Sequence, residues 1–234
     1  MLLLGHRGSW GLHPENTMPA FQAALDSGLD GIEFDVQPTL DGQLVVRHDE
    51  SLPSGEPVSS LTLEQLRRAE PELPTLDQVL TWWMAKGCWL NLELKNDRSR
   101  WDARERLLLE ALDRAGPSAA QLRRLVISSF SPVSLHRLYW QDHGLQLGLL
   151  YWAETPAWLP ALARWAPLYS LHPNYRLIRP SWLREVQRQG LSVLAWTVND
   201  PVAAARLAGW GVDGLIGDLP AALLEAPARL GRAG

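Results

Sequence analysis

The feature that most constrains the fold is a rhythm of short apolar runs, each followed by a longer segment of helical period. The first half alternates LLLG, GIEFDV, LVVRHD and CWLNLELK with segments such as TMPAFQAALDSG and TLDQVLTWWMAKG. The second half continues with LRRLVISSF, LQLGLLYW, PLYSLHP, LSVLAWTVN and DGLIG. About eight strand–helix units indicate parallel strands joined by right-handed crossovers. The sequence therefore predicts an α/β protein of the (β/α)8 TIM-barrel type.

The alternative fold is an open doubly wound sheet, but no G-x-G-x-x-G or P-loop motif follows any of the apolar runs. Residues 50–74 break the rhythm, because they are rich in Pro, Ser and Glu and contain one short helical piece. They are typical of a small insertion on a loop after the second strand region. A chain of 234 residues lies in the range of one barrel, so we expect a single domain over residues 1–234.

Composition narrows the possible partners. A formal charge of −4 and a pI near 5.9 argue against a nucleic-acid-binding protein, which normally presents a basic face. The single cysteine excludes a disulfide framework and a thiol cluster, so a metal ion would bind oxygen or nitrogen ligands. The run MLLL is too short for a signal peptide, and no uncharged run is long enough to span a membrane. We expect a cytoplasmic protein without stable membrane insertion; its oligomeric state is left open.

Two predicted strands carry charged residues where a parallel barrel requires apolar ones. In GIEFDV, Glu33 and Asp35 lie two residues apart and therefore point to the same side of the strand. In NLELK, Asn91, Glu93 and Lys95 alternate with leucines in the same way. Neighbouring strands thus direct three carboxylates and one ammonium group to one side of a buried sheet.

Three buried carboxylates need a positive partner, because an unpaired buried charge costs several kcal/mol. An all-oxygen site without cysteine suits a hard divalent cation, Mg²⁺ or Ca²⁺. The alternative is a buried salt-bridge network without metal, built from these carboxylates, Lys95 and an arginine. Both interpretations stay open at this point.

Two histidines favour an active site. His6 and Arg7 follow the first apolar run, and LVVRHD ends in His48-Asp49, so we expect these groups at the carboxyl ends of early barrel strands. Imidazoles titrate near neutral pH and can act as a general acid/base pair. Arg7 offers a planar guanidinium suited to phosphate oxygens. Together with the carboxylates, these residues predict metal-assisted substitution at an anionic phosphorus.

Several segments carry a resemblance to a known family. HRG, PENT followed by AFQAAL, GLDGIEFDVQPTLDGQLVVRHDE, PTLDQVL, LNLELK, AWTVND and GVDGLIGDLP occur in this order. These segments resemble the glycerophosphodiester phosphodiesterase family, most specifically in the first fifty residues. The resemblance implies a TIM barrel that hydrolyses small glycerophosphodiester substrates to sn-glycerol 3-phosphate and an alcohol, with a bound divalent cation, Mg²⁺ or Ca²⁺.

The resemblance also implies a role for each central residue. The general acid/base pair of the family corresponds to His6 and His48, and the metal-binding carboxylates correspond to Glu33, Asp35 and Glu93. In the implied mechanism, one histidine helps the glycerol 2-hydroxyl attack phosphorus, and the other protonates the departing alcohol. Water then opens the resulting cyclic phosphate. Which histidine acts first as the base is left open.

Other residues fall on substrate-binding or supporting positions of the family. Arg7 and Lys95 correspond to positions that contact phosphate or polarise the site, and Trp196 to an aromatic residue that packs on glycerol. Glu15 and Asn16, in PENT, are expected to support the loop near the first histidine, with Asn16 or the following threonine capping a helix.

Two other functions are considered. The tryptophans of LLYWAETPAWLPALARW could form an apolar rim for an acyl chain, which would suit a lysophospholipase D-like activity on lysolipids. A non-catalytic polyol-phosphate binding protein would be marked by loss of a histidine or carboxylate of the site. All five of those residues are present in this sequence.

Overall fold

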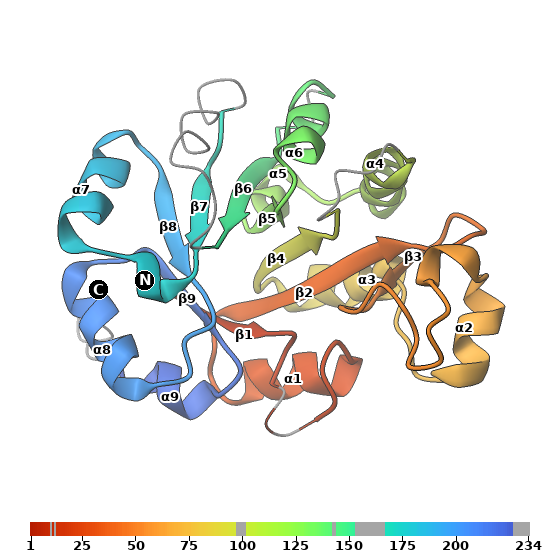
Figure 1. Cartoon of the computed structure of the whole chain (residues 1–234), viewed down its shortest axis with the longest axis horizontal. Helices are drawn as coiled ribbons and strands as arrows, with labels where there is room; N and C mark the ends of the chain where they lie inside the picture. The colour runs from red at the N-terminus through yellow and green to blue at the C-terminus, as the bar shows by residue number, and fades with distance from the viewer. Residues whose placement is uncertain (10, 12, 97–101, 142–143, 153–166, 227–234) are drawn as a thin grey trace.

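A closed parallel barrel forms the centre of the molecule (Figure 1). The computed structural model describes residues 1–9, 11, 13–96, 102–141, 144–152 and 167–226. Within them, eight parallel strands follow the order β1-β9-β8-β7-β6-β5-β4-β2, and pairing of β1 with β2 closes the barrel. The barrel strands are β1 (Leu2–His6), β2 (Gly31–Pro38), β4 (Trp89–Leu94), β5 (Leu125–Ser129), β6 (Gln146–Tyr151), β7 (Ser170–Pro173), β8 (Ser192–Ala195) and β9 (Gly214–Gly217). The predicted TIM barrel is confirmed.

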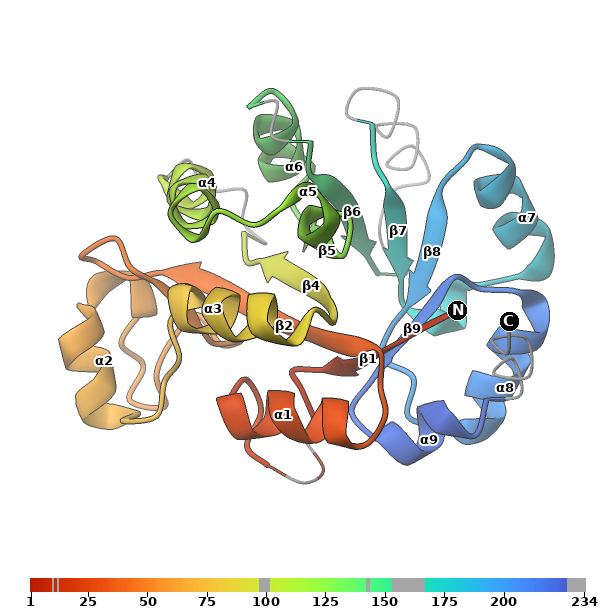
Figure 2. The same ribbon diagram turned by 180° about the vertical axis from the view of Figure 1, so that it is seen from behind.

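Helices surround the ring of strands, as Figures 1 and 2 show from opposite sides. Threonine hydroxyls start two of them: Thr17 caps α1 as predicted for PENT, and Thr75 forms a capping box at α3. Gly87 ends α3 in the left-handed conformation, with φ of 65°. The main helices are α1 (Met18–Asp26), α3 (Leu76–Lys86), α4 (Arg104–Ala115), α5 (Ala119–Leu122), α6 (Pro132–Tyr139), α7 (Pro180–Arg188), α8 (Pro201–Trp210) and α9 (Pro220–Leu224), with a 3-10 turn, η3 (Tyr175–Leu177), before α7.

The core separates the two faces of each strand. Ile32 and Phe34 of β2 are fully buried in the main core with Phe21 of α1 and Trp83 of α3. Because side chains alternate along a strand, the intervening residues of β2 point into the barrel. The strand pattern therefore places its charged residues inside the ring and its apolar residues under the helices.

The strand after β2 does not belong to the barrel. β3 (Leu44–Val46) pairs antiparallel with β2, with Val46 opposite Val36, contrary to the expectation that LVVRHD is a barrel strand. The physical cause is the tight turn through Asp41 and Gly42, where Gly42 has φ of 75°, a conformation that favours glycine. The chain therefore folds back along β2 instead of crossing over through a helix.

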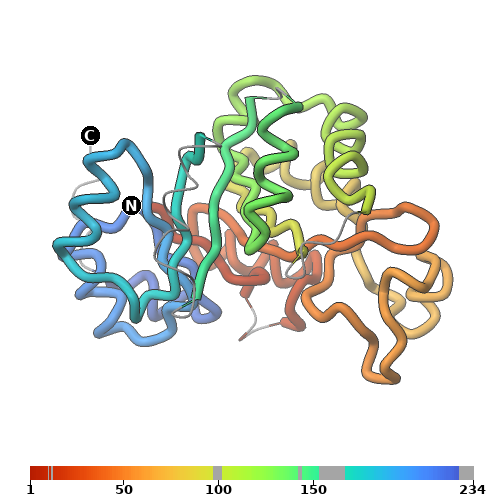
Figure 3. The backbone as a smooth tube through the Cα atoms, turned by 45° about the horizontal axis from the view of Figure 1, so that its top comes forward, coloured from red at the N-terminus to blue at the C-terminus, as the bar shows by residue number. Residues whose placement is uncertain are grey.

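Residues 44–74, which we call the excursion, project from one side of the barrel (Figure 3). They contain β3, η1 (Val58–Ser60) and α2 (Leu63–Ala69). Their small core is separate from the main one and consists of Val45, Leu52, Val58, Leu66 and Leu73. The insertion predicted for residues 50–74 lies within this segment.

The helices of the described residues include no candidate membrane span. None of them is both long enough and apolar enough to cross a bilayer.

Candidate active site

A cavity of about 460 Å³ opens at the carboxyl ends of the barrel strands. Its wall combines charged groups with aromatic rings. Seven of the residues singled out from the sequence line it: His6, Arg7, Glu33, His48, Glu93, Lys95 and Trp196. The other three contact this set. Asp35 and Glu15 each pair with Arg7, and Asn16 donates a hydrogen bond to Asp35. The structure therefore brings the whole predicted set together.

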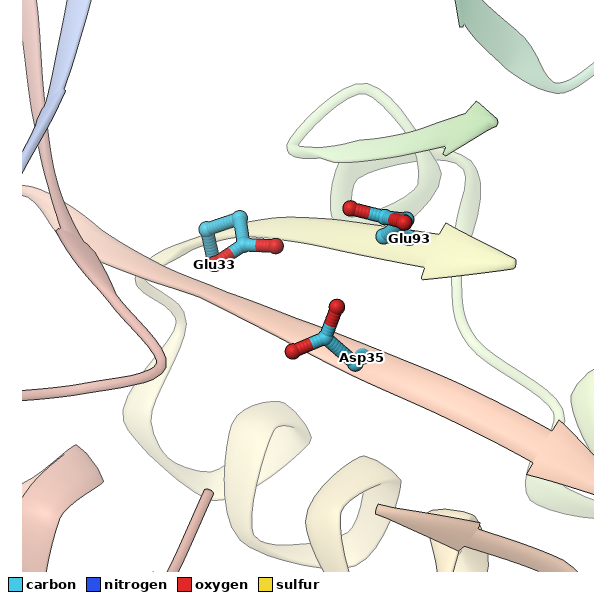
Figure 4. Close-up of side chains that lie close together, drawn as sticks. All are labelled: Glu33, Asp35 and Glu93. Carbon is cyan, nitrogen blue, oxygen red and sulfur yellow. The ribbon is translucent and has the colours of Figure 1, made fainter. Parts of the chain in front are cut away.

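The three predicted metal ligands converge (Figure 4). Glu33 and Asp35 come from β2 and Glu93 from β4, with Asp35 directly beside Glu93 in the strand register. One carboxylate oxygen from each residue lies within 4.8 Å of the other two. The residues are only 4%, 1% and 7% exposed, so water cannot screen their mutual repulsion.

The titration of these carboxyls reflects their crowding. Burial, reinforced by the charge of Asp35, raises the pKa of Glu33 to about 7 and that of Glu93 to about 8. Burial also acts on Asp35, but the charges of Lys95 and Arg7 outweigh it and keep the Asp35 pKa below its ordinary value. The protein's own cations thus balance one carboxylate and leave two that resist ionisation.

This electrostatic imbalance tests whether the residues fit a divalent cation. Lys95 Nζ lies 3.0 Å from Glu93 and 3.7 Å from Asp35, and Arg7 Nε lies 3.4 Å from Asp35. A metal-free salt-bridge network explains Asp35 but leaves Glu33 and Glu93 undercompensated. The donor set consists of oxygen atoms, the ligands that Mg²⁺ and Ca²⁺ prefer, so the residues fit such an ion.

His6 has a carboxylate partner that the sequence analysis did not single out. His6 Nδ1 lies 2.5 Å from Asp218 Oδ1. Asn199 holds Asp218 in place: its Nδ2 donates to Asp218 Oδ2, and its Oδ1 accepts from the Asp218 backbone N–H. Burial lowers the His6 pKa, but the Asp218 hydrogen bond and the charge of Glu33 outweigh it, so the pKa is raised. The available signal was the position of Asp218 directly after the last barrel strand, in LIGDLP.

His48 reaches the same cavity from the excursion. Its Nδ1 lies 2.8 Å from Asp49 Oδ1, and this hydrogen bond lowers the pKa of Asp49. Gln37 of β2 donates from Nε2 to the carbonyls of Arg47 and Asp49, at 2.9 and 2.8 Å. The hairpin and this amide clamp, and not a barrel strand end, therefore position the second imidazole.

The loops after β1 are held in strained conformations around Arg7. Both Arg7 and Asn16 have positive φ, at 52° and 57°. The Arg7 N–H donates to Glu33 Oε2 at 3.0 Å, and its guanidinium binds Glu15 at 2.9 Å. Asn16 donates from its backbone to Arg7 at 2.9 Å and from Nδ2 to Asp35 at 3.0 Å. Glu15 and Asn16 thus connect the PENT loop to the acidic cluster.

Three aromatic side chains, Phe130, Trp152 and Trp196, also line the cavity. The rings of Phe130 and Trp152 stack with their centroids 5.6 Å apart. The ring of Trp196 is nearly perpendicular to both, with its centroid 5.7 Å from that of Phe130 and 4.6 Å from that of Trp152. Trp152 is 54% exposed at the mouth of the cavity. The other two tryptophans of the expected apolar rim, Trp158 and Trp165, lie outside the described residues.

Comparison with known proteins agrees with this architecture. The family model for the glycerophosphoryl diester phosphodiesterase family matches residues 6–222. A glycerophosphodiester phosphodiesterase from Caldanaerobacter subterraneus subsp. tengcongensis is 35% identical, over 96% of both chains.

Solved structures show the same fold. One is a glycerophosphodiester phosphodiesterase from Thermotoga maritima, with a TM-score of 0.80 and 26% identity over 98% of both chains. Another is an Oleispira antarctica phosphodiesterase in complex with the product sn-glycerol-3-phosphate. It has a TM-score of 0.86 and 26% identity, over 97% of this chain and 96% of that one. By sequence and by fold, the chain belongs to the glycerophosphoryl diester phosphodiesterase family, a family of phosphoric diester hydrolases.

Proposed function

We propose that this enzyme hydrolyses glycerophosphodiesters to sn-glycerol 3-phosphate and an alcohol with the help of a divalent cation. The observation that carries the proposal is the meeting of two imidazoles with three buried carboxylates around one cavity. The product in the related Oleispira structure supports the same substrate class.

The single cysteine suits a reducing compartment, and we place the enzyme in the cytoplasm.

Glu33, Asp35 and Glu93 would hold the cation, Mg²⁺ or Ca²⁺. When bound, it would supply positive charge to neutralise a phosphoryl oxygen and the carboxylates around it. The raised pKa values of Glu33 and Glu93 support this role, because both carboxyls gain most from a nearby positive charge.

The two imidazoles would move the protons. One accepts the proton of the glycerol 2-hydroxyl as that oxygen attacks phosphorus, and the other donates a proton to the departing alcohol oxygen. Water then opens the resulting cyclic phosphate to give sn-glycerol 3-phosphate. Attack by a hydroxyl of the same substrate is favoured because the nucleophile is already in place. Asp218 orients His6, and Asp49 orients His48, through their Nδ1 atoms.

Arg7, Lys95 and Trp196 would bind the substrate. Arg7 and Lys95 bring positive charge to the wall of the cavity, where a phosphate would be attracted. Trp196 offers an apolar ring in the wall of the same cavity for the glycerol carbons. Glu15 and Asn16 would act indirectly, by holding the loop that carries Arg7.

A second candidate is lysophospholipase D-like activity. The exposed Trp152 and its packing on Phe130 favour it, because a large apolar side chain at a cavity mouth can bind an acyl chain. The family match and the intact set of histidines and carboxylates favour an enzyme over a non-catalytic polyol-phosphate binding protein.

A coupled assay for released sn-glycerol 3-phosphate tests these proposals. Glycerophosphocholine and glycerophosphoethanolamine should be hydrolysed, EDTA should stop the reaction, and added Mg²⁺ or Ca²⁺ should restore it. His48→Ala should abolish turnover, whereas His136→Ala should not, because His136 lies on α6 and does not line the cavity. Full activity of His48→Ala, or in excess EDTA, would contradict the mechanism. Lysophosphatidylcholine would yield lysophosphatidic acid and choline, so this substrate is followed by released choline; faster choline release from it than from glycerophosphocholine would favour the second candidate.

A further inference from the structure

One polar side chain in the cavity has no hydrogen-bond partner. Asn91 of β4 is 1% exposed, yet neither its Nδ2 nor its Oδ1 atom bonds to any residue that the structure describes. Buried amides are almost always hydrogen-bonded, since desolvating them without compensation is costly. An unpartnered carboxamide at this depth indicates a group that binds something other than the protein.

The position of Asn91 shows where that partner would lie. His6, Glu33 and Asn91 are consecutive register partners on β1, β2 and β4, and all three line the cavity. They form one layer at its floor, with adjacent strands about 4.8 Å apart. Glu93 lies two residues further along β4 on the same face. The amide therefore lies beside the acidic cluster and in the same layer as His6.

Each of the two nearby cations, Arg7 and Lys95, gives at least one of its donors to a carboxylate. Arg7 Nη1 donates to Glu15 at 2.9 Å, and Lys95 Nζ lies 3.0 Å from Glu93. Phosphate oxygens only accept hydrogen bonds, so a phosphate at this floor needs donors. The Nδ2 group of Asn91 is a neutral donor that is not engaged by any described residue, and it carries no proton that changes with pH.

We infer that Asn91 is a further substrate-binding residue, whose Nδ2 group donates a hydrogen bond to a phosphoryl oxygen of the ester and of the product. The inference rests on the proposed function and adds a residue to it. It also explains why an amide stands where leucine, of similar size, would fill the same space without buried polar atoms.

Replacing Asn91 by leucine separates a binding role from a structural one. If Asn91 only supported the barrel, Asn91→Leu would lower stability and thereby disturb the site. If Asn91 awaits a ligand, the same change removes an uncompensated amide and leaves the protein as stable as before or more stable. Loss of binding together with retained stability is therefore the signature of the inferred role.

The experiment measures the Tm and, by calorimetry, the binding of two probes: Mg²⁺ alone, and sn-glycerol 3-phosphate at saturating Mg²⁺. Asn91→Leu should keep the Tm and bind Mg²⁺ within about twofold of the parent, while affinity for sn-glycerol 3-phosphate falls about tenfold to a hundredfold. Asn91→Asp should weaken sn-glycerol 3-phosphate binding further and strengthen Mg²⁺ binding, because it adds a carboxylate. Asn91→Ala is a second variant that removes the amide, for the case that leucine does not fit, and it should weaken sn-glycerol 3-phosphate binding in the same way.

Ser128→Ala is the matched control. Ser128 is buried on β5 beside Glu93, and its hydroxyl likewise lacks a partner among the described residues, but it does not line the cavity. It should leave binding of both probes unchanged. Unchanged sn-glycerol 3-phosphate affinity in Asn91→Leu and Asn91→Ala would overturn the inference, and so would a loss of Mg²⁺ affinity, which would make Oδ1 an ion ligand. A parent protein that neither binds sn-glycerol 3-phosphate nor hydrolyses glycerophosphocholine would instead refute the proposed function.

Discussion

Replacing Asp218 by asparagine tests the arrangement around His6. The substitution keeps the shape of the side chain but removes the negative charge 2.5 Å from His6 Nδ1. A hydrogen bond to a charged group contributes about 1.5–3 kcal/mol, and 1.36 kcal/mol corresponds to one pKa unit. Both groups are mostly buried, at 18% and 16% side-chain exposure, so solvent screens little of this interaction. The pKa of His6 should therefore fall when Asp218 loses its charge.

The same change should also slow turnover. Asparagine can present its amide to Nδ1 and favour the wrong imidazole tautomer, an effect that costs about 10⁴ in kcat in serine proteases. We expect kcat for glycerophosphocholine to fall about 10²- to 10⁴-fold by the same mechanism. The limb of the kcat/KM profile that reports His6 should move to lower pH, because Asp218 raises the pKa of this histidine.

The assay is a pH–rate profile of released sn-glycerol 3-phosphate, together with NMR titration of the His6 ring protons. Asp49→Asn is the matched control, since Asp49 contacts the other imidazole and its side chain is 71% exposed. Exposed pairs contribute little, so this variant should lose less than about tenfold in rate and leave the His6 pKa in place. An Asp218→Asn enzyme with a wild-type rate and an unmoved His6 titration would refute the reasoning.

Three further predictions concern the proposed ion site and the backbone. Glu93→Gln should weaken Mg²⁺ or Ca²⁺ binding at least about tenfold in calorimetry, because it removes one of the three carboxylate charges of the cluster; unchanged affinity would exclude Glu93 as a ligand. In EDTA, the free energy of unfolding should fall by a few kcal/mol between about pH 5 and pH 8. The raised pKa values of Glu33 and Glu93, about 7 and about 8, mean that the folded state holds protons that the unfolded state releases. Urea titrations should show this loss reduced by saturating Mg²⁺, and a flat profile in EDTA would contradict it. Gly31→Ala should destabilise the protein by about 3 kcal/mol or more, since its Cβ would lie 2.0 Å from the Trp89 carbonyl oxygen. Gly209→Ala, in α8 with no atom beyond its chain neighbours and its own helix backbone within 4 Å of the added carbon, should instead raise the Tm slightly, and similar thermal shifts for both variants would be inconsistent with the packing.

Much of the architecture could be predicted because it depends on local periodicity. The alternation in GIEFDV and NLELK places Glu33, Asp35 and Glu93 on one face, and parallel register then brings them together. The direction of β3 depends instead on the turn at Asp41 and Gly42, whose Asp-Gly pair is a recognisable hairpin signal. Weighing that signal against the strand–helix rhythm would have predicted the hairpin.

The rest of the site depends on contacts between distant segments. Asp218 meets His6 across 212 residues of sequence, at the point where the first and last barrel strands pair. Asn91 was visible on the inward face, but the absence of a partner for its amide is a property of the folded interior alone. Periodicity predicts the direction in which a side chain points. Its neighbours in space can be known only from the closed barrel.

The antiparallel hairpin has a consequence for how this catalyst can diversify. His6 stands on the barrel itself, whereas His48 stands on a segment whose apolar residues Val45 and Leu66 pack in a core of their own. Substitutions in that small core can shift one imidazole relative to the other while leaving the carboxylates of the barrel in place. Under the proposed function, remodelling this peripheral module would change how the leaving alcohol fits beside His48, while the carboxylate cluster of the barrel stays intact.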